Sequence, residues 1–191
     1  MSAIVQPPVK ALSVTMEGEP NGFKPSATYR SQVLHGGLTR LEISSPGDKL
    51  HIIHQALVDV IEFPCKIRYL RMTDRNTGQL PKPISYAGVD ISKERLFVAL
   101  KDFHQLIYQD ARHQFWILGA NQEQIVMDEL GMIYVYPDDF LFTDVLLKMG
   151  WTTLRHQAMS EEDYVQVYFT SAADKQEQAL LENFRLIRWE G

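Results

Sequence analysis

Residues His113–Tyr136 read HQFWILGANQEQIVMDELGMIYVY and contain three apolar runs close together. The runs His113–Leu118, Glu123–Asp128 and Met132–Tyr136 each have the length and the aromatic or β-branched content of a strand. The linkers GANQ and ELG have the length of hairpin loops. FWIL and IVM are apolar at consecutive positions, so we expect both faces of this meander to be covered. The stretch therefore predicts the antiparallel centre of a sheet.

Helical patterns flank this meander on both sides. Before it, Ser92 is placed to cap a helix with an apolar stripe at spacings of four, three and four residues. The stripe consists of Leu96, Leu100, Phe103 and Ile107. After the meander, Asp138 or Asp139 is placed to cap a helix that ends near Gly150. Runs of hairpin strands between helices predict an α+β domain with a largely antiparallel sheet and helices packed against it.

The N-terminal residues differ from this pattern. Residues 1–37 are interrupted by Pro and Gly, and we predict a poorly structured, extended arm there. Residues 38–191 are predicted to form one domain, which begins with a short strand at Leu38–Ile43. Within it, Ile84–Ile91 is expected as an edge strand, because prolines precede it, and a last helix is expected from Ser171 to about Arg188.

The composition is that of an ordinary globular protein, with 191 residues of which 45% are apolar and 23% charged. No apolar run approaches the roughly 18 residues of a membrane span, and the N-terminus lacks a signal-peptide pattern. Cys65 is the only cysteine, which excludes an internal disulfide and a multi-cysteine zinc site and suits a reducing compartment. These features predict a cytoplasmic protein that does not bind membranes.

Charge is divided unevenly along the chain, whose net charge is −5. Residues 1–100 have 12 Lys and Arg against 9 Asp and Glu, and residues 101–191 have 7 against 15. Because the acidic half also contains many Tyr and Trp, it favours contact with a basic protein and disfavours nucleic acid. The alternative is an ordinary solvated surface. The predicted partner-binding residues are Asp128, Glu129, Tyr134, Tyr136, Asp138, Asp139, Asp144 and Trp151.

The sequence has no phosphate-binding glycine loop, no nucleophile elbow and no HExxH zinc motif. We therefore expect no cofactor, no metal and no catalytic residue, and a non-enzymatic protein rather than an enzyme. The histidines leave an alternative open. His51 and His54 lie three residues apart on one predicted helix, and His104 and His113 lie near the next helix-to-strand junction. If they meet an acid in a pocket, a small enzyme or ligand-binding domain is favoured.

The segment Ile125–Phe142, IVMDELGMIYVYPDDFLF, resembles the central part of immunity proteins of the SUKH superfamily. The shared features are a strand that ends in Asp128, a turn with Gly131, and an aromatic strand that precedes a helix. The resemblance implies a small, acidic α+β module that binds and neutralises a toxin domain.

From Ser92 onward, the predicted order of elements also resembles that of type III secretion chaperones. That resemblance implies a chaperone or assembly component that forms a homodimer through the apolar helix Phe140–Met149. Taken together, the sequence predicts a non-enzymatic, cytoplasmic protein-binding module, of which an immunity protein with a basic toxin or effector partner is the most specific form.

Overall fold

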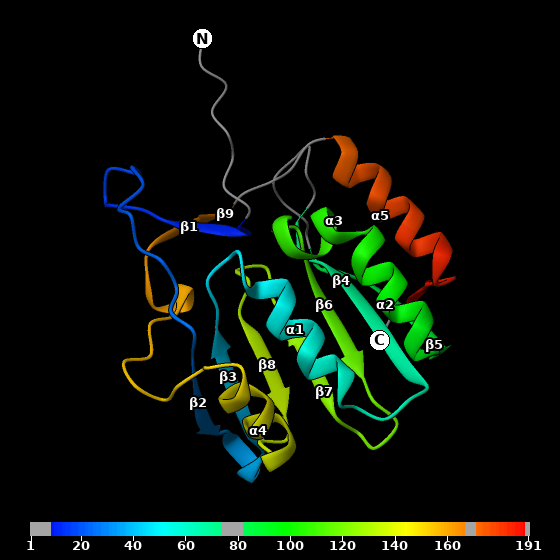
Figure 1. Ribbon diagram of the computed structural model, residues 1–191. Coiled ribbons are helices and arrows are strands. Elements are labelled where there is room, and N and C mark those ends of the chain that lie inside the picture. The colour runs from blue at the N-terminus through cyan, green and yellow to red at the C-terminus, as the bar shows by residue number, and fades with distance from the viewer. Residues whose placement is uncertain (1–8, 74–81, 167–170, 190–191) are drawn as a thin grey trace.

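The computed structural model describes residues 9–73, 82–166 and 171–189, and its centre is an antiparallel sheet of eight strands (Figure 1). The strands are β2 (Thr28–Val33), β3 (Thr39–Ser44), β4 (Cys65–Arg71), β5 (Ile84–Ile91), β6 (His113–Leu118), β7 (Gln124–Met127), β8 (Ile133–Tyr136) and β10 (Ile187–Trp189). Across the sheet their order is β10-β5-β4-β6-β7-β8-β3-β2.

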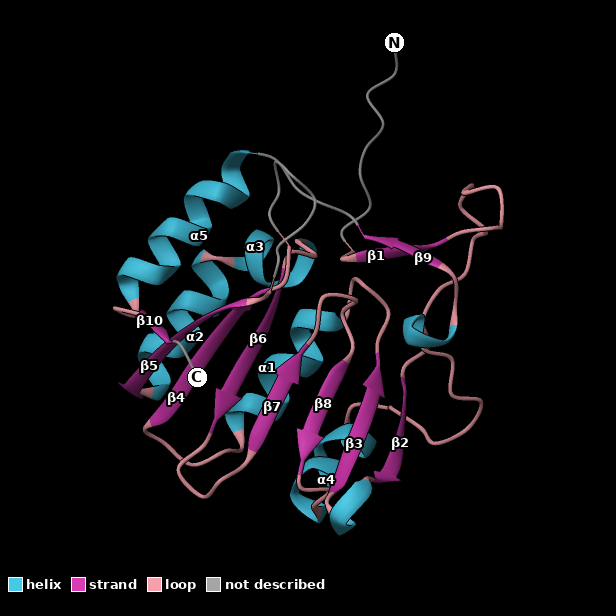
Figure 2. Cartoon of the chain, turned by 180° about the vertical axis from the view of Figure 1, so that it is seen from behind, coloured by secondary structure: helices cyan, strands magenta, loops and turns pink. Residues whose placement is uncertain are grey.

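The described helices lie on one face of this sheet, and the view from behind shows the other face without a helix (Figures 1 and 2). They are α1 (Leu50–Asp59), α2 (Lys93–Asp102), α3 (His104–Gln109), α4 (Phe140–Lys148) and α5 (Ser171–Asn183). Side chains alternate between the two faces of a strand, so every second residue of β4 and β6 points to the helices. Ile67, Phe115 and Ile117 are fully buried there, in one core with Leu57 and Leu100 of the helices.

The predicted fold class, an α+β domain with a largely antiparallel sheet, is confirmed. The predicted meander is present as β6, β7 and β8. Both predicted helix caps also form. Ser92 Oγ accepts a hydrogen bond from the Arg95 N–H (3.3 Å), and the Asp139 carboxylate accepts one from the Leu141 N–H (2.9 Å). Gly150 follows α4 with a φ of +86°, a conformation that favours glycine.

Three features differ from the sequence-based expectations. The helix expected from Ser92 through Ile107 is divided into α2 and α3, because the chain leaves helical geometry at Phe103 (φ −103°, ψ 26°). The last helix ends at Asn183, and residues Ile187–Trp189 pair instead with β5, which is therefore not an edge strand. In the described part of the chain, helices cover the meander on one face only (Figure 2).

The N-terminal residues, expected as a loose arm, take part in two sheets. β2 pairs with β3 along its whole length, from Thr28 opposite Ser44 to Val33 opposite Thr39, and forms an edge of the main sheet. β1 (Ala11–Ser13) pairs with β9 (Tyr164–Gln166) in a small separate sheet at one end of the molecule (Figure 1). The boundary expected at residue 37 therefore falls between two paired strands. Residues 1–8 lie outside the described part of the chain.

Candidate binding surface

The face of the sheet opposite the helices presents a row of side chains in register. From β4 through β6 and β7 to β8, the row consists of Arg68, Trp116, Val126 and Tyr134. Adjacent strands are about 4.8 Å apart, so this part of the row spans about 15 Å. We call the surface around the row the open face; it comprises Arg30, Arg40, Glu42, Lys66, Arg68, Gln114, Trp116, Val126, Tyr134, Tyr136 and Trp189.

Arg68 lies between two tryptophans on the open face. Its guanidinium carbon is 5.3 Å from the ring centre of Trp116 and 4.9 Å from that of Trp189, distances typical of cation–π contacts. Arg68 Nε donates a hydrogen bond to Ser85 Oγ (2.9 Å), and Trp116 Nε1 donates one to Gln114 Oε1 (3.1 Å). These contacts order the side chains before a partner arrives, which lowers the entropic cost of binding.

A second stack lies on the other side of Val126. The guanidinium carbon of Arg40 is 4.5 Å from the ring centre of Tyr134, and Arg40 Nη1 donates a hydrogen bond to Tyr136 Oη (3.2 Å). Burial and the nearby carboxylate of Asp128 raise the pKa of Tyr134, so its phenol stays neutral at physiological pH. Val126 itself is buried although no described helix covers it. The aromatic and arginine side chains thus shield the apolar floor of this face.

Glu42, which pairs with Tyr134 in the register of β3 and β8, is the one carboxylate among the residues named for the open face, and arginines neutralise it. Arg30 Nη2 is 2.6 Å and Arg40 Nη2 is 3.6 Å from its carboxylate oxygens, and His156 Nε2 lies 3.2 Å away. Arg30 Nη1 also contacts Glu161 (2.7 Å). Glu42, His156 and Glu161 are the one group with the spacing of a metal site among the described residues. The Arg30 guanidinium already forms ion pairs with the carboxylates of Glu42 and Glu161. We therefore interpret this group as an ion-pair cluster, rather than a metal site, that attaches the segment after α4 to the sheet.

Two acids of the predicted partner-binding set, Asp128 and Glu129, lie at the β7–β8 turn. Asp128 is buried, and its Oδ1 accepts hydrogen bonds from the backbone N–H groups of Leu130 (2.9 Å) and Met132 (2.8 Å). Burial raises the pKa of Asp128 to about 6. Glu129 accepts a hydrogen bond from Gln114 Nε2 (2.9 Å) and so borders the open face.

The other predicted residues are spread over the molecule. Asp138 accepts a hydrogen bond from the hydroxyl of Ser31 at the edge of the sheet. Asp139 caps α4, and Asp144 forms an ion pair with Lys148 (2.6 Å) on the same helix. Trp151 is buried, and its Nε1 donates a hydrogen bond to the Ser44 carbonyl (2.9 Å). Of the predicted set, the structure places Tyr134 and Tyr136 on the open face but not the acids of α4 or Trp151.

Sequence reasoning missed the most aromatic part of this face. The alternation in KIRYLRM does place Lys66 and Arg68 on one side of β4, which is a readable signal. Trp189 could not be found in that way, because it reaches Arg68 only through the pairing of β10 with β5.

The histidines form two groups. The rings of His51 and His104 lie 5.0 Å apart, and His54 Nδ1 is 3.0 Å from Tyr108 Oη, whereas His113 stacks on Tyr69 elsewhere in the core. Burial lowers the pKa of His54 to about 3 and that of His113 well below its ordinary value. No described carboxylate is hydrogen-bonded to any of these four histidines. The acid–histidine arrangement that would favour an enzyme is therefore not assembled among the described residues.

None of the described helices is both long and apolar enough to span a membrane. No protein-family model, curated protein or solved structure matches the chain.

Proposed function

We propose that this protein is a non-enzymatic binding module that holds a protein partner on the open face. The observation that carries the proposal is the pair of ordered stacks, Trp116–Arg68–Trp189 and Tyr134–Arg40, beside each other on a sheet face that no described helix covers. Trp, Tyr and Arg are the residues that contribute most to protein–protein binding, particularly where they cluster near the centre of a surface.

The charge of the open face favours a partner with acidic side chains. Lys66 is exposed on this face, and among the described residues the Arg68 side chain has two tryptophans and Ser85 as neighbours and no carboxylate. The expectation of a basic partner depended on acids such as Asp128 and Asp139, which bond backbone N–H groups within the fold. The immunity-type form of the proposal draws on the segment Ile125–Phe142, whose tyrosines lie on the open face.

Affinity capture from the native cell extract tests this function. We expect a protein that is captured by the wild-type chain to be lost with Trp116→Ala combined with Tyr134→Ala. The matched control is Val98→Ala combined with Phe140→Ala, since Val98 (56% exposed) and Phe140 (78% exposed) belong to the helices. Loss of capture with the control pair, and retention with the open-face pair, would contradict the proposal.

A further inference from the structure

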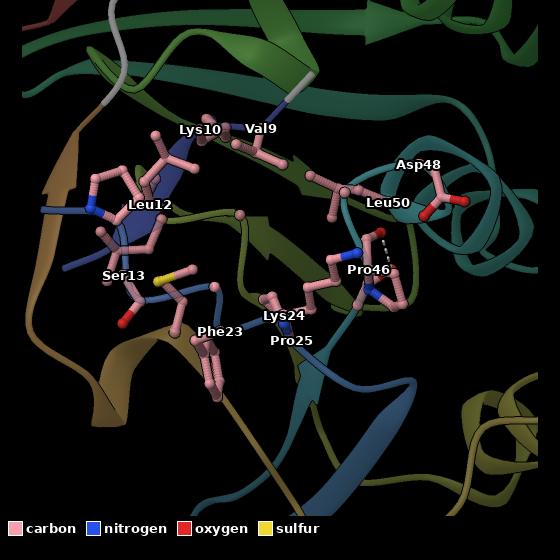
Figure 3. A pocket seen from close by; sticks show the side chains of 18 residues that line it. Val9, Lys10, Leu12, Ser13, Phe23, Lys24, Pro25, Pro46, Asp48 and Leu50 are labelled. Atoms are coloured by element: carbon pink, nitrogen blue, oxygen red, sulfur yellow. Dashed lines mark hydrogen bonds between the residues drawn. The ribbon is translucent and has the colours of Figure 1, made fainter. Parts of the chain in front are cut away.

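A cavity of about 450 Å³ lies between the small β1–β9 sheet and the end of the main sheet (Figure 3). Its wall is mostly apolar and comes from segments far apart in the chain: Leu12 of β1, Phe23 and Pro25 before β2, Leu50 at the start of α1, and Met159. Apolar cavities of about 150 Å³ already take up benzene, and about 300–1,000 Å³ is usual for small-molecule sites. The space is therefore large enough for a small organic molecule.

The buried hydroxyl groups of the wall already have partners within the fold. They belong to Ser13 and Ser45. Ser13 Oγ accepts a hydrogen bond from Asn21 Nδ2 (2.6 Å) and donates one to Glu162 Oε2 (3.4 Å), and Ser45 Oγ donates one to the Pro46 carbonyl (3.0 Å). Because these hydroxyls are engaged, a ligand gains little from hydrogen bonds to them.

Lys10 contributes the stem of its side chain to the wall. A methyl group placed on Gly131 would lie 3.3 Å from Leu50 Cδ2 and 3.9 Å from Lys10 Cδ, and all three residues line the cavity. The Lys10 ammonium is buried and donates a hydrogen bond to the His113 carbonyl (3.3 Å). Its charge is favoured by three carboxylates of the fold, those of Asp128, Asp110 and Glu129. Lys10 therefore gives no reason to expect an anionic ligand.

The two other charged residues of the lining are exposed and have opposite signs. Lys24 precedes β2 and Asp48 precedes α1. Because both are exposed, they lie on the solvent side of the cavity, and together they favour neither an anion nor a cation. A charged group that moved past them to the apolar wall would lose its hydration without gaining a partner.

We infer that the cavity binds a small uncharged molecule with an alkyl or ring body, which lies among Leu12, Phe23 and Leu50. Its polar end is directed to the solvent side at Lys24 and Asp48. The wall disfavours a sugar or a nucleotide, because such ligands need several free donors and acceptors and the buried hydroxyls are engaged. This site is separate from the open face and does not depend on the function proposed for it.

The test titrates the wild-type protein with butanol, hexanol and octanol, followed through methyl NMR signals. Because each added CH2 group buries more apolar surface, the affinity should rise about fourfold per CH2 group. The signals that shift should include those of Leu12, Leu50 and Met159, which line the cavity. Octanoate and octylammonium have chains of the same length with opposite charges, and both should bind more weakly than octanol.

Variants then locate the ligand. Leu12→Asp places a charge in the wall and should weaken octanol binding at least about tenfold. Met16→Asp is the matched control, because Met16 lies in the same segment, is 95% exposed and is outside the lining; it should leave the affinity unchanged. An octanol affinity no higher than that of butanol, or shifts confined to residues outside the cavity, would overturn the inference even if Leu12→Asp does not fold. So would tighter binding of octanoate or octylammonium than of octanol, or octanol binding that Leu12→Asp leaves unchanged.

Discussion

The two faces of the main sheet are built from alternate residues of the same strands, yet they are stabilised differently. On the helix side, Phe115 and Ile117 are fully buried in the core. On the open face, the intervening residue Trp116 is half-buried, and it is held by a cation–π contact with Arg68 and a hydrogen bond to Gln114. The covered face thus derives stability from dense packing, whereas the open face combines local order with accessibility. That difference makes the open face suitable for binding.

The largest expected effect of a single substitution is on stability at neutral pH, and it separates the two faces at adjacent positions of β6. Phe115→Ala should lower the free energy of unfolding by about 3–5 kcal/mol, because it leaves a cavity in the core. Trp116→Ala should lower it by only about 1 kcal/mol, because Trp116 is half-buried and contacts no helix layer. Urea denaturation measures both values. Similar losses at the two positions would mean that the faces do not differ as described.

The next effect concerns pH and belongs to the covered face. His54 and His113 are buried and neutral, with folded-state pKa values below the ordinary value near 6.5. Below that pH the unfolded chain takes up protons that the folded chain does not. The free energy of unfolding should therefore fall as the pH is lowered from about 6.5 to 4, by up to about 1.4 kcal/mol per pH unit for each histidine.

Asp128 acts in the opposite direction in part of this range. Its folded-state pKa of about 6 lies above the ordinary value, so between pH 4 and 6 the folded chain holds the extra proton. His54→Gln keeps a polar group for Tyr108 but removes one titrating imidazole. Urea denaturation at pH 7, 6, 5 and 4 should show that the free energy of unfolding falls less steeply with decreasing pH in the variant than in the wild type. A loss as steep as that of the wild type would exclude His54 as a source of acid sensitivity.

The smallest expected effect distinguishes binding by the open face from binding by the acidic residues that the sequence predicted to contact the partner. Asp138→Lys combined with Asp139→Lys should cost about 1–2 kcal/mol of stability, because Asp139 caps α4. Partner capture should persist, since neither residue belongs to the aromatic row. If this double variant folds but captures nothing, the acids after β8 rather than the open face bind the partner.

Local patterns predicted those parts of the fold that depend on neighbours in sequence. The strands β6–β8 and the caps at Ser92 and Asp139 follow from turn lengths and from side chains within three residues of a helix start. By contrast, Ile187 continues the helical stripe of Leu180 and Phe184, and only pairing with β5 makes it part of a strand. Nonlocal pairing overrides local periodicity there.

The candidate site could be predicted only in part for the same reason. Tyr134 and Tyr136 were identified because they are large aromatic residues in a predicted strand of the acidic half, which is a local signal. Their neighbours Trp116, Arg40 and Arg68 reach the same surface through the order of the strands, and this order is not encoded in any short window. The acids were assigned to a binding surface because tyrosines and tryptophans accompany them in the sequence. Asp128 is buried and accepts backbone hydrogen bonds in the β7–β8 turn, whereas Asp139 is exposed and caps α4.

Photo-crosslinking from the two sides of the molecule tests the central claim most directly. A benzoylphenylalanine residue at Leu118, on the open side of β6, should crosslink to the partner in living cells. The same residue at Val98, on the exposed side of α2, should not. We predict that the Leu118 crosslink disappears when Trp116→Ala is added. A partner that crosslinks from Val98 and not from Leu118 would contradict the assignment of the open face as the binding surface.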